Sequence, residues 1–174
     1  MSEIYPNLFL GDVGASNNAS FIKKSNITHI LVAGKGLKQH FETKCTYMQL
    51  EIEDVSATKI ITYFIDSIKF IDEAIASRKG VLVHCLGGVS RSATIVIAYI
   101  MIKEQKSFTE AYRFVQKRRP RINPNSGFIT QLELFEKCLK YYFDNTKGDK
   151  IDYPFLTVCI TPRIKELEKI MAEK

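Results

Sequence analysis

The sequence has few cysteines, and their spacing excludes two kinds of site. Four cysteines occur among 174 residues, and no two of them form a CxxC pair. Structural zinc sites commonly use such pairs, so we expect no metal site and no cofactor. A disulfide framework is not expected either, since a reactive thiol needs a reducing compartment. We therefore expect Cys45, Cys138 and Cys159 to be ordinary core or surface thiols.

Membrane-spanning and targeting segments are also lacking. The apolar run from Ala93 to Ile102 stops at Lys103, which is too short for a membrane span. Polar residues follow Met1, so no secretory leader is expected, and there is neither a myristoylation glycine nor a prenylation box. We expect no membrane association and an intracellular protein that is cytoplasmic, with a nuclear location also open.

Charge is dispersed along most of the chain. The formal net charge is +6, which suits a nucleic-acid partner. However, no aromatic residues are interleaved with the basic ones, so we expect no nucleic-acid partner. The basic residues cluster only at Lys117-Arg118-Arg119 and Arg121. This cluster either forms a positive rim that attracts phosphorylated or acidic segments, or completes the last turn of a helix stopped by Pro120.

The pattern of apolar residues predicts strands that alternate with helices. Strands are expected over 8–10, 28–33, 46–52 and 81–84, and helices over 18–25, 59–78, 91–104, 108–118 and 126–143. The short apolar stretch at 81–84 is typical of a central strand. The alternation indicates an α/β fold with a small, mostly parallel central sheet flanked by helices.

The most informative stretch is HCLGGVSRS, from His84 to Ser92. It lies between a predicted strand and a predicted helix, so its backbone amides are at a helix N-terminus, where an anion is favoured. The paired glycines let the loop curl with its amides pointing inward. The inner positions that we expect to bind a phosphate are Leu86, Gly87, Gly88, Val89 and Ser90.

A cysteine and an arginine bound this loop. The thiolate of Cys85 is the attacking form, and the amides, the helix end and Arg91 all favour it. Arg91 has a planar fork that can hold two phosphate oxygens in the transition state. The implied reaction is attack of Cys85 on phosphorus, followed by hydrolysis of the cysteinyl phosphate. The alternative is a small core cysteine, which leaves the glycines, the arginine and the strand–helix context unexplained.

At these residues the chain resembles the cysteine-dependent dual-specificity protein phosphatases of the protein tyrosine phosphatase superfamily. The resemblance is collinear over residues 4–143. It also includes an opening strand at Ile4 to Gly11, a second strand at Ile27 to Leu31, the Ala98 to Met101 segment, and a helix start at Asn123 to Phe128. It implies a catalytic domain over 1–145 that acts on proteins phosphorylated at tyrosine, serine or threonine.

The resemblance also implies roles for individual residues. Asp54 matches the family's proton donor, with Glu53 as the rival acid and a solvated loop acid as the alternative reading. Ser92 matches a hydroxyl that stabilises the departing thiolate. His84 matches a buried histidine that orients the loop and helps to keep the cysteine ionised. Asn125 matches an asparagine that braces the loop, although it can equally cap the following helix.

The resemblance does not cover the extension at 146–174. The polar segment Asp144 to Lys150 predicts a hinge, and the apolar stretch Ile151 to Ile160 is expected to be extended. Thr161-Pro162 is expected to begin a short helix. The extension either packs on the core or donates a strand to a second copy, so the protein is expected to be a monomer or a homodimer.

The loop composition also limits the substrate. Its inner positions carry no charge, whereas lipid-directed relatives have lysines there, so inositol lipids are not expected. The chain shows no long N-terminal module of the kind that deepens the pocket in tyrosine-specific relatives. We therefore expect a shallow pocket that admits phosphoserine, phosphothreonine and phosphotyrosine. The rival hypothesis is a catalytically silent phosphate reader, but Cys85, Arg91 and Asp54 are all present.

Overall fold

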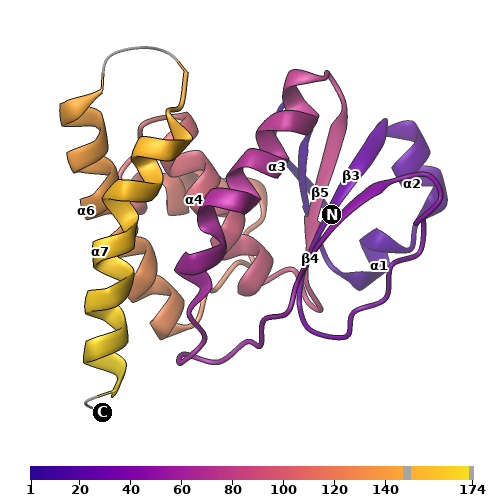
Figure 1. The fold of residues 1–174 in the computed structure, drawn as a ribbon. Helices are drawn as coiled ribbons and strands as arrows, with labels where there is room; N and C mark the ends of the chain where they lie inside the picture. The colour runs from indigo at the N-terminus through magenta and orange to yellow at the C-terminus, as the bar shows by residue number, and fades with distance from the viewer. Residues whose placement is uncertain (147–149, 173–174) are drawn as a thin grey trace.

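A five-stranded sheet forms the centre of the computed structural model, which describes residues 1–146 and 150–172 (Figure 1). The strand order is β1-β2-β5-β3-β4, with β1 antiparallel to β2 and the other pairs parallel. The strands are β1 (Ser2–Tyr5), β2 (Leu8–Gly11), β3 (Ile27–Ala33), β4 (Thr46–Leu50) and β5 (Gly80–His84). The predicted α/β fold, with a mostly parallel sheet and 81–84 as its central strand, is confirmed.

Two layers of unequal size cover the sheet. Leu31 and Val83 face a large helical layer, while their neighbours Ile30 and Leu82 face a smaller cluster with α2, because successive side chains in a strand point to opposite faces. The helical elements are α1 (Val13–Ser16), α2 (Ala19–Lys24), the 3₁₀ turn η1 (Ile60–Tyr63), α3 (Phe64–Ala76), α4 (Arg91–Lys103), α5 (Phe108–Arg118), α6 (Ser126–Asn145) and α7 (Tyr153–Ala172).

Helix α4 is the buried centre of the large layer. Every residue from Ser92 to Ile102 is buried, as expected of a helix that is apolar on all sides. The helix follows directly on central strand β5. The connecting loop therefore lies at the carboxyl edge of the parallel strands, where α/β sheets commonly bind their ligands.

Two predicted elements differ in detail from the structure. The single strand expected over Ile4 to Gly11 is divided into β1 and β2, because Asn7 adopts φ 66° and turns the chain between them. The helix expected over 59–78 begins as the 3₁₀ turn η1, and its α-helical part covers only Phe64–Ala76. No side chain of the described residues caps η1.

The C-terminal extension is helical, so the expectation of an extended segment over Ile151 to Ile160 was wrong. Helix α7 begins at Tyr153, where Asp152 accepts a hydrogen bond from the Phe155 amide (3.0 Å). Pro162, expected to begin a helix, lies inside one. The β-branched residues between them favour strands locally, but packing overrides that preference.

Helix α7 packs along α6 and reaches α3 (Figure 1). Leu156 and Ile160 join the same buried cluster as the core of the large layer. Tyr153 donates a hydrogen bond to Asp72 of α3 (2.6 Å). The segment expected to be a hinge includes residues 147–149, which lie outside the described residues.

None of the helices within the described ranges is both long enough and apolar enough to cross a bilayer.

Candidate active site

The loop between β5 and α4 has its carbonyl groups bound from outside. All six carbonyls from Cys85 to Ser90 accept a hydrogen bond. The Cys85 carbonyl accepts from His84 Nδ1 (3.4 Å), and the Leu86 carbonyl accepts from the Val13 amide (3.3 Å). The Gly87 and Gly88 carbonyls accept from Arg121 Nη2 (2.8 Å) and Arg119 Nε (2.8 Å), respectively. The Val89 and Ser90 carbonyls accept from the amides of Asn123 (2.9 Å) and Thr94 (2.8 Å), respectively. With every carbonyl occupied, the loop backbone has a defined orientation.

The loop amides consequently point to the inside. A planar trans peptide places its N–H opposite its C=O, so the amides of residues 86–91 turn away from the bound carbonyls. The amide of Gly88 donates to Cys85 Sγ (3.2 Å), and so does the Ser92 hydroxyl (3.2 Å). The loop is thus a bowl of inward amides with a sulfur at its base, an arrangement that binds anions.

Gly88 is required where the bowl turns most sharply. It adopts φ +62°, a conformation that residues with a side chain rarely take. A Cβ atom at this position would also overlap the Gly11 carbonyl and the Arg119 guanidinium. The expectation that a glycine lets the loop curl therefore has a specific basis at position 88.

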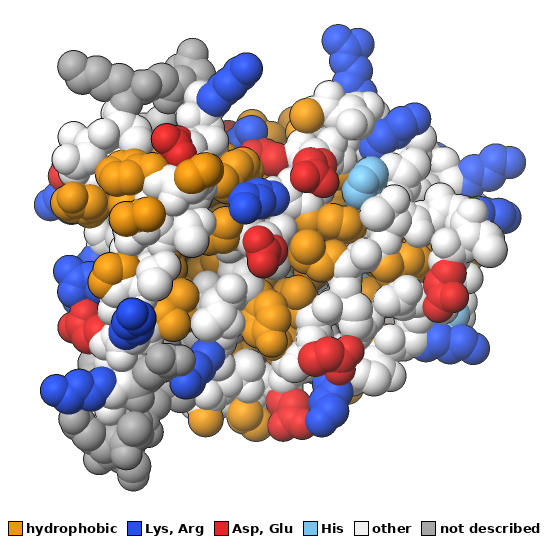
Figure 2. All heavy atoms as spheres, viewed as in Figure 1, with side chains coloured by type: hydrophobic (Ala, Val, Ile, Leu, Met, Phe, Trp, Pro, Cys, Tyr) orange, Lys and Arg blue, Asp and Glu red, His pale blue; other side chains and the backbone are white. Residues whose placement is uncertain are grey.

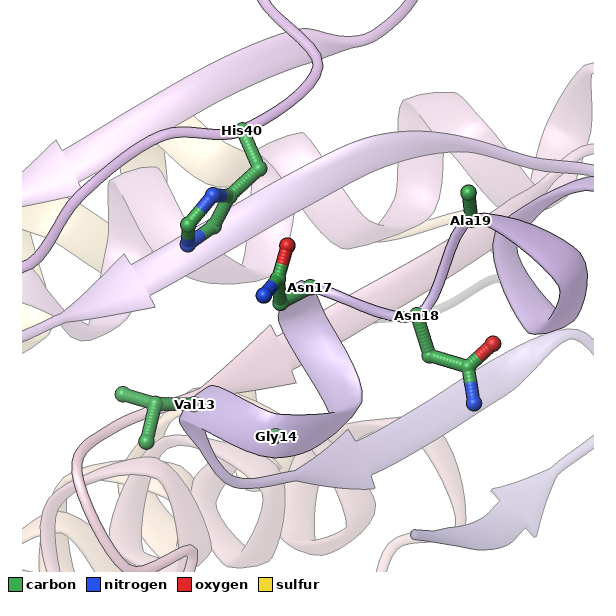
Figure 3. A pocket seen from close by; sticks show the side chains of 6 residues that line it. All are labelled: Val13, Gly14, Asn17, Asn18, Ala19 and His40. Carbon is green, nitrogen blue, oxygen red and sulfur yellow. The ribbon is translucent and has the colours of Figure 1, made fainter.

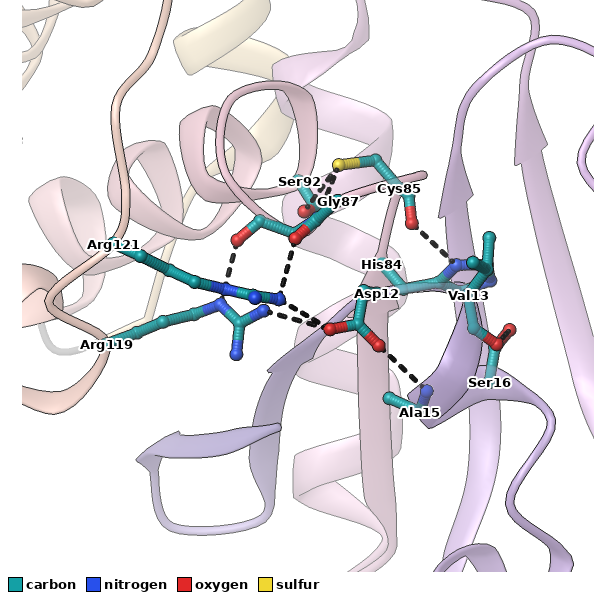
Figure 4. Close-up of polar contacts among 11 residues, drawn as sticks. Asp12, Val13, Ala15, Ser16, His84, Cys85, Gly87, Ser92, Arg119 and Arg121 are labelled. Atoms are coloured by element: carbon teal, nitrogen blue, oxygen red, sulfur yellow. Dashed lines mark hydrogen bonds and ion pairs between the residues drawn. The ribbon is translucent and has the colours of Figure 1, made fainter.

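Three charged residues brace the outside of the bowl (Figure 4). Arg119 is 4% exposed, and its guanidinium lies 3.5 Å from Asp12. Arg121 also pairs with Asp12. Burial favours the neutral form of Asp12, but a hydrogen bond from the Ala15 amide, together with the two arginines, lowers the pKa of Asp12 below its usual value. Sequence reasoning did not identify Asp12, because nothing around it indicates a partner more than 100 residues away.

The basic cluster is divided between a helix end and the outside of the phosphate loop, and its loop-facing arginines do not form a free positive rim. Arg118 ends α5 and stacks on Phe114 at 3.8 Å from the ring centroid, as a helix-end residue. Arg119 and Arg121 lie against the loop, but both are engaged with its carbonyls and with Asp12. The contribution of these two arginines to the site is therefore mainly to hold the loop.

His84 lies behind the loop, where the resemblance placed it. It is fully buried, and burial lowers its pKa to about 4. A carbonyl oxygen only accepts, so the 3.4 Å contact with the Cys85 carbonyl requires the ring proton on Nδ1. His84 is therefore neutral at pH 7 and acts on the loop by hydrogen bonding and packing, without adding a positive charge.

Asp54 reaches the bowl from the loop after β4. Its Oδ1 accepts hydrogen bonds from the Ser90 hydroxyl (2.7 Å) and the Asn125 amide nitrogen (2.9 Å). Its Oδ2 lies 3.6 Å from Arg91 Nε. The rival acid, Glu53, is 65% exposed on its side chain and pairs with Lys35 (3.9 Å). The structure thus brings Asp54 to the loop and leaves Glu53 on the surface.

Asn125 fulfils both roles that the sequence left open. Its Oδ1 accepts from the Phe128 amide (3.0 Å) and so caps α6, while its Nδ2 donates to Asp54. Its own backbone amide donates to the Ser90 hydroxyl (3.2 Å). One residue therefore connects the start of α6, the segment that carries Asp54 and the phosphate loop.

Arg91 begins α4 and extends toward Asp54. Its Nη1 donates to the Ile52 carbonyl (3.4 Å), and a Cβ atom on Gly34 would crowd this nitrogen. Nε is buried and makes no hydrogen bond within the described part of the chain. A buried guanidinium nitrogen without an acceptor is costly, so this atom is suited to a ligand oxygen.

Metal-ligand clusters are not found at this site or elsewhere in residues 1–146 and 150–172, where no three acidic, histidine or cysteine side chains converge suitably.

Comparison with known proteins gives a consistent result. The family description "Dual specificity phosphatase, catalytic domain" matches residues 8–138. Dual specificity protein phosphatase 1B of Arabidopsis thaliana is 45% identical over 140 residues, which cover 80% of this chain and 84% of that protein. Dual specificity protein phosphatase 19 of Mus musculus is 40% identical over 148 residues, or 85% of this chain and 66% of the mouse protein.

A solved structure agrees with these sequences. The human tyrosine phosphatase-like serine/threonine/tyrosine-interacting protein superposes with a TM-score of 0.78 at 37% identity. The alignment covers 80% of this chain and 97% of the human one.

Proposed function

Since the chain belongs to the dual specificity phosphatases and is a phosphatase, we propose that it hydrolyses phosphotyrosine and phosphoserine or phosphothreonine on proteins through a cysteinyl-phosphate intermediate. The observation that carries this mechanism is the bowl itself. Inward amides surround Cys85 Sγ, and two hydrogen-bond donors contact the sulfur directly. Such donors stabilise a thiolate and leave it facing a bound phosphate.

In the first step Cys85 Sγ attacks phosphorus and the bond from phosphorus to the ester oxygen breaks. The loop amides and Arg91 hold the other phosphate oxygens as charge develops on them. The leaving oxygen takes a proton from Asp54. Because Oδ1 of Asp54 already accepts two hydrogen bonds, Oδ2 is the oxygen from which this proton is delivered.

In the second step water attacks the phosphorus and the bond from phosphorus to sulfur breaks. Asp54, now a carboxylate, accepts a proton from the attacking water. The departing sulfur regains negative charge, and the Ser92 hydroxyl at 3.2 Å is placed to stabilise it. Inorganic phosphate is released and the thiolate is restored.

The test of the nucleophile is Cys85→Ser assayed with para-nitrophenyl phosphate. We expect turnover to be abolished, because a serine hydroxyl is not ionised at neutral pH. The variant should still bind tungstate, a phosphate analogue, since the amides are unchanged. Substantial turnover by Cys85→Ser would refute the assignment.

The test of the acid is Asp54→Asn with two substrates that differ in leaving group. An alkyl phosphate needs the proton far more than para-nitrophenyl phosphate does, so its hydrolysis should slow more. Glu53→Gln is the matched control and should leave both rates unchanged. An equal loss on both substrates in Asp54→Asn would assign the proton transfer to another group.

A second function is favoured by one observation. One of the similar solved structures is described as phosphatase-like, which suits a module that binds phosphorylated segments. This function would be carried by the same bowl without turnover. It is established if wild-type protein binds a phosphopeptide tightly and releases no phosphate from it.

A further inference from the structure

An open hollow of about 620 Å³ lies beside the phosphate loop. Figure 3 shows the side chains that line it, from α1, the turn that joins α1 to α2, and the loop before β4. They are Val13, Gly14, Asn17, Asn18, Ala19 and His40. None of the mechanistic steps above uses these side chains.

The hollow is continuous with the phosphate loop. Val13, which lines the hollow, donates its amide to the Leu86 carbonyl of the loop (3.3 Å). Helix α1 follows β2 and the phosphate loop follows β5, and these strands are parallel neighbours, so the hollow and the bowl lie at the same carboxyl edge of the sheet. A chain whose phosphate occupies the bowl can therefore extend along this hollow.

Apolar side chains are exposed where the hollow meets the loop. Leu86 is 59% exposed and Val13 is 37% exposed. Val55, directly after Asp54, is a third exposed hydrophobic residue at the site. Exposed apolar side chains around a polar site indicate contact with apolar groups of a partner.

Two of the three polar side chains that line the hollow have no hydrogen-bond partner among the described residues. Asn18 uses its Oδ1 to cap α2, but the side chains of Asn17 and His40 make no hydrogen bond to any described residue. An amide and an imidazole can both donate and accept, which matches the alternating groups of a peptide backbone. His40 is held in place because its own backbone amide donates to Tyr47 Oη (3.3 Å).

The hollow offers nothing to an acidic segment. Among the described residues, no lysine, arginine, aspartate or glutamate lines it. Arg119 and Arg121, which hold the outside of the loop, are paired with Asp12. An acidic substrate residue would lose hydration there without gaining a cation.

We propose that this hollow binds the residues that adjoin the phosphorylated residue of a protein substrate, and that it selects an apolar neighbour. The substrate backbone hydrogen-bonds to Asn17 and His40, and the apolar side chain packs on Val13 and Leu86. This inference rests on the proposed function, since it takes the bowl as the phosphate site.

The first test compares two phosphopeptides that differ in the residues flanking the phosphotyrosine, leucine in one and glutamate in the other. We expect kcat/KM to favour the leucine peptide by about tenfold, the effect of one buried side chain. An equal rate for both peptides, or a preference for glutamate, overturns the selectivity.

The second test is the double variant Asn17→Ala/His40→Ala. Its KM for the leucine peptide should rise by about tenfold, as expected for two lost hydrogen bonds. Its kcat/KM for para-nitrophenyl phosphate, which has no flanking residues, should be unchanged. Val158→Ala serves as the control, since its helix α7 lies on the opposite side of the molecule from α1 (Figure 1). An unchanged KM for the peptide overturns the proposal.

Failure of the proposed function gives a different result. In that case the wild type hydrolyses neither peptide nor para-nitrophenyl phosphate. The hollow is then tested by calorimetric affinity for the leucine peptide, with Cys85→Ser alone and combined with Asn17→Ala/His40→Ala. Equal affinities overturn the hollow as a binding site, and a weaker triple variant supports it.

Discussion

Arg119 illustrates how a residue outside the loop fixes the loop. Its buried guanidinium contacts Gly88 of the bowl on one side and Asp12 on the other. Without this residue the Gly88 carbonyl would lack its donor, and Asp12 would keep only Arg121 as a partner. The orientation of the Gly88 peptide therefore depends on a charge pair between residues that are 107 positions apart in the chain.

We expect Arg119→Met to lower the free energy of unfolding by about 2 kcal/mol, because the buried Gly88 carbonyl loses its donor while Asp12 keeps Arg121 as a partner. Tungstate binding should weaken as well, because the Gly88 carbonyl is no longer held outward, and Arg119→Lys should restore part of that binding. Urea unfolding and calorimetry measure the two effects.

The neighbouring Arg118→Met is the matched control, since Arg118 is exposed and stacks on Phe114. Its free energy of unfolding should change by less than about 0.5 kcal/mol. If Arg119→Met binds tungstate as well as the wild type, the brace contributes to stability alone.

His84 predicts a pH dependence of stability. In the unfolded chain its imidazole takes up a proton near its ordinary pKa of 6.5, whereas in the folded protein the pKa is about 4. The unfolded state thus binds more protons between these values, so the free energy of unfolding falls as pH drops from 6.5 to about 4. The loss from this residue is about 3 kcal/mol.

The measurement is urea unfolding at pH 7 and pH 4.5 for the wild type and His84→Gln. Carboxylates contribute equally to both proteins, so the difference between them reports His84 alone. We expect the variant to be less stable at pH 7 but to lose less stability on acidification. Equal losses in the two proteins would show that His84 does not titrate as its burial implies.

At the scale of elements, the sequence predicted local order well and long-range contacts poorly. The β5–loop–α4 unit has its signals within the contiguous segment 80–103, namely an apolar strand, paired glycines and an apolar helix. Asp54 and Asn125 were placed by family resemblance rather than by physical pattern. Asp12 carries no local signal, because its partners are set by how β2 and the segment after α5 meet in the folded chain.

Helix α7 was misread for a related reason. Its β-branched and aromatic residues favour an extended chain, and the internal proline suggested a helix start at the wrong place. What stabilises the helix is burial of Leu156 and Ile160 within the same chain, together with the Asp152 cap. The burial is tertiary, and the sequence pattern does not reveal it. The cap is local, and Asp152 is a helix-start signal that the sequence does contain.

We expect Leu156→Ala to destabilise the protein by about 3 kcal/mol, the typical cost of a buried leucine truncated to alanine. Leu156 is fully buried in the same cluster as the core. Val158→Ala, two residues along the helix and 64% exposed, should cost less than about 0.5 kcal/mol. Thermal unfolding measures both, and similar values for the two variants would mean that α7 is not part of the cooperative unit.

At the scale of the whole molecule, the site depends on segments from most of the chain. Asp12 follows β2, Asp54 follows β4, Cys85 follows β5, and Asn125 begins α6. Parallel strands bring their carboxyl ends to one edge of the sheet, so the first three segments meet there by topology alone. A parallel sheet with a phosphate loop after its central strand therefore determines where these segments meet, independently of the side-chain contacts between them.

Helix α7 also bears on the oligomeric state of the protein. A strand donated to a second copy was one sequence-based route to a homodimer, but the segment concerned is a helix whose buried face packs on its own chain. In the described part of the face that carries α6 and α7, hydrophobic side chains are interrupted by polar and charged groups (Figure 2). The exposed hydrophobic side chains of these two helices include Tyr141 and Val158. Stable dimers bury a larger and more continuous apolar surface.

We therefore expect a monomer with a mass near 19.9 kDa when sedimentation equilibrium is measured at micromolar concentration. Val158→Lys, which places a charge on the exposed face of α7, should leave that mass unchanged. A mass of twice this value in the wild type would contradict the expectation. If Val158→Lys then restored the monomer, the dimer would form through α7, because a lysine buried at such an interface carries an unpaired charge.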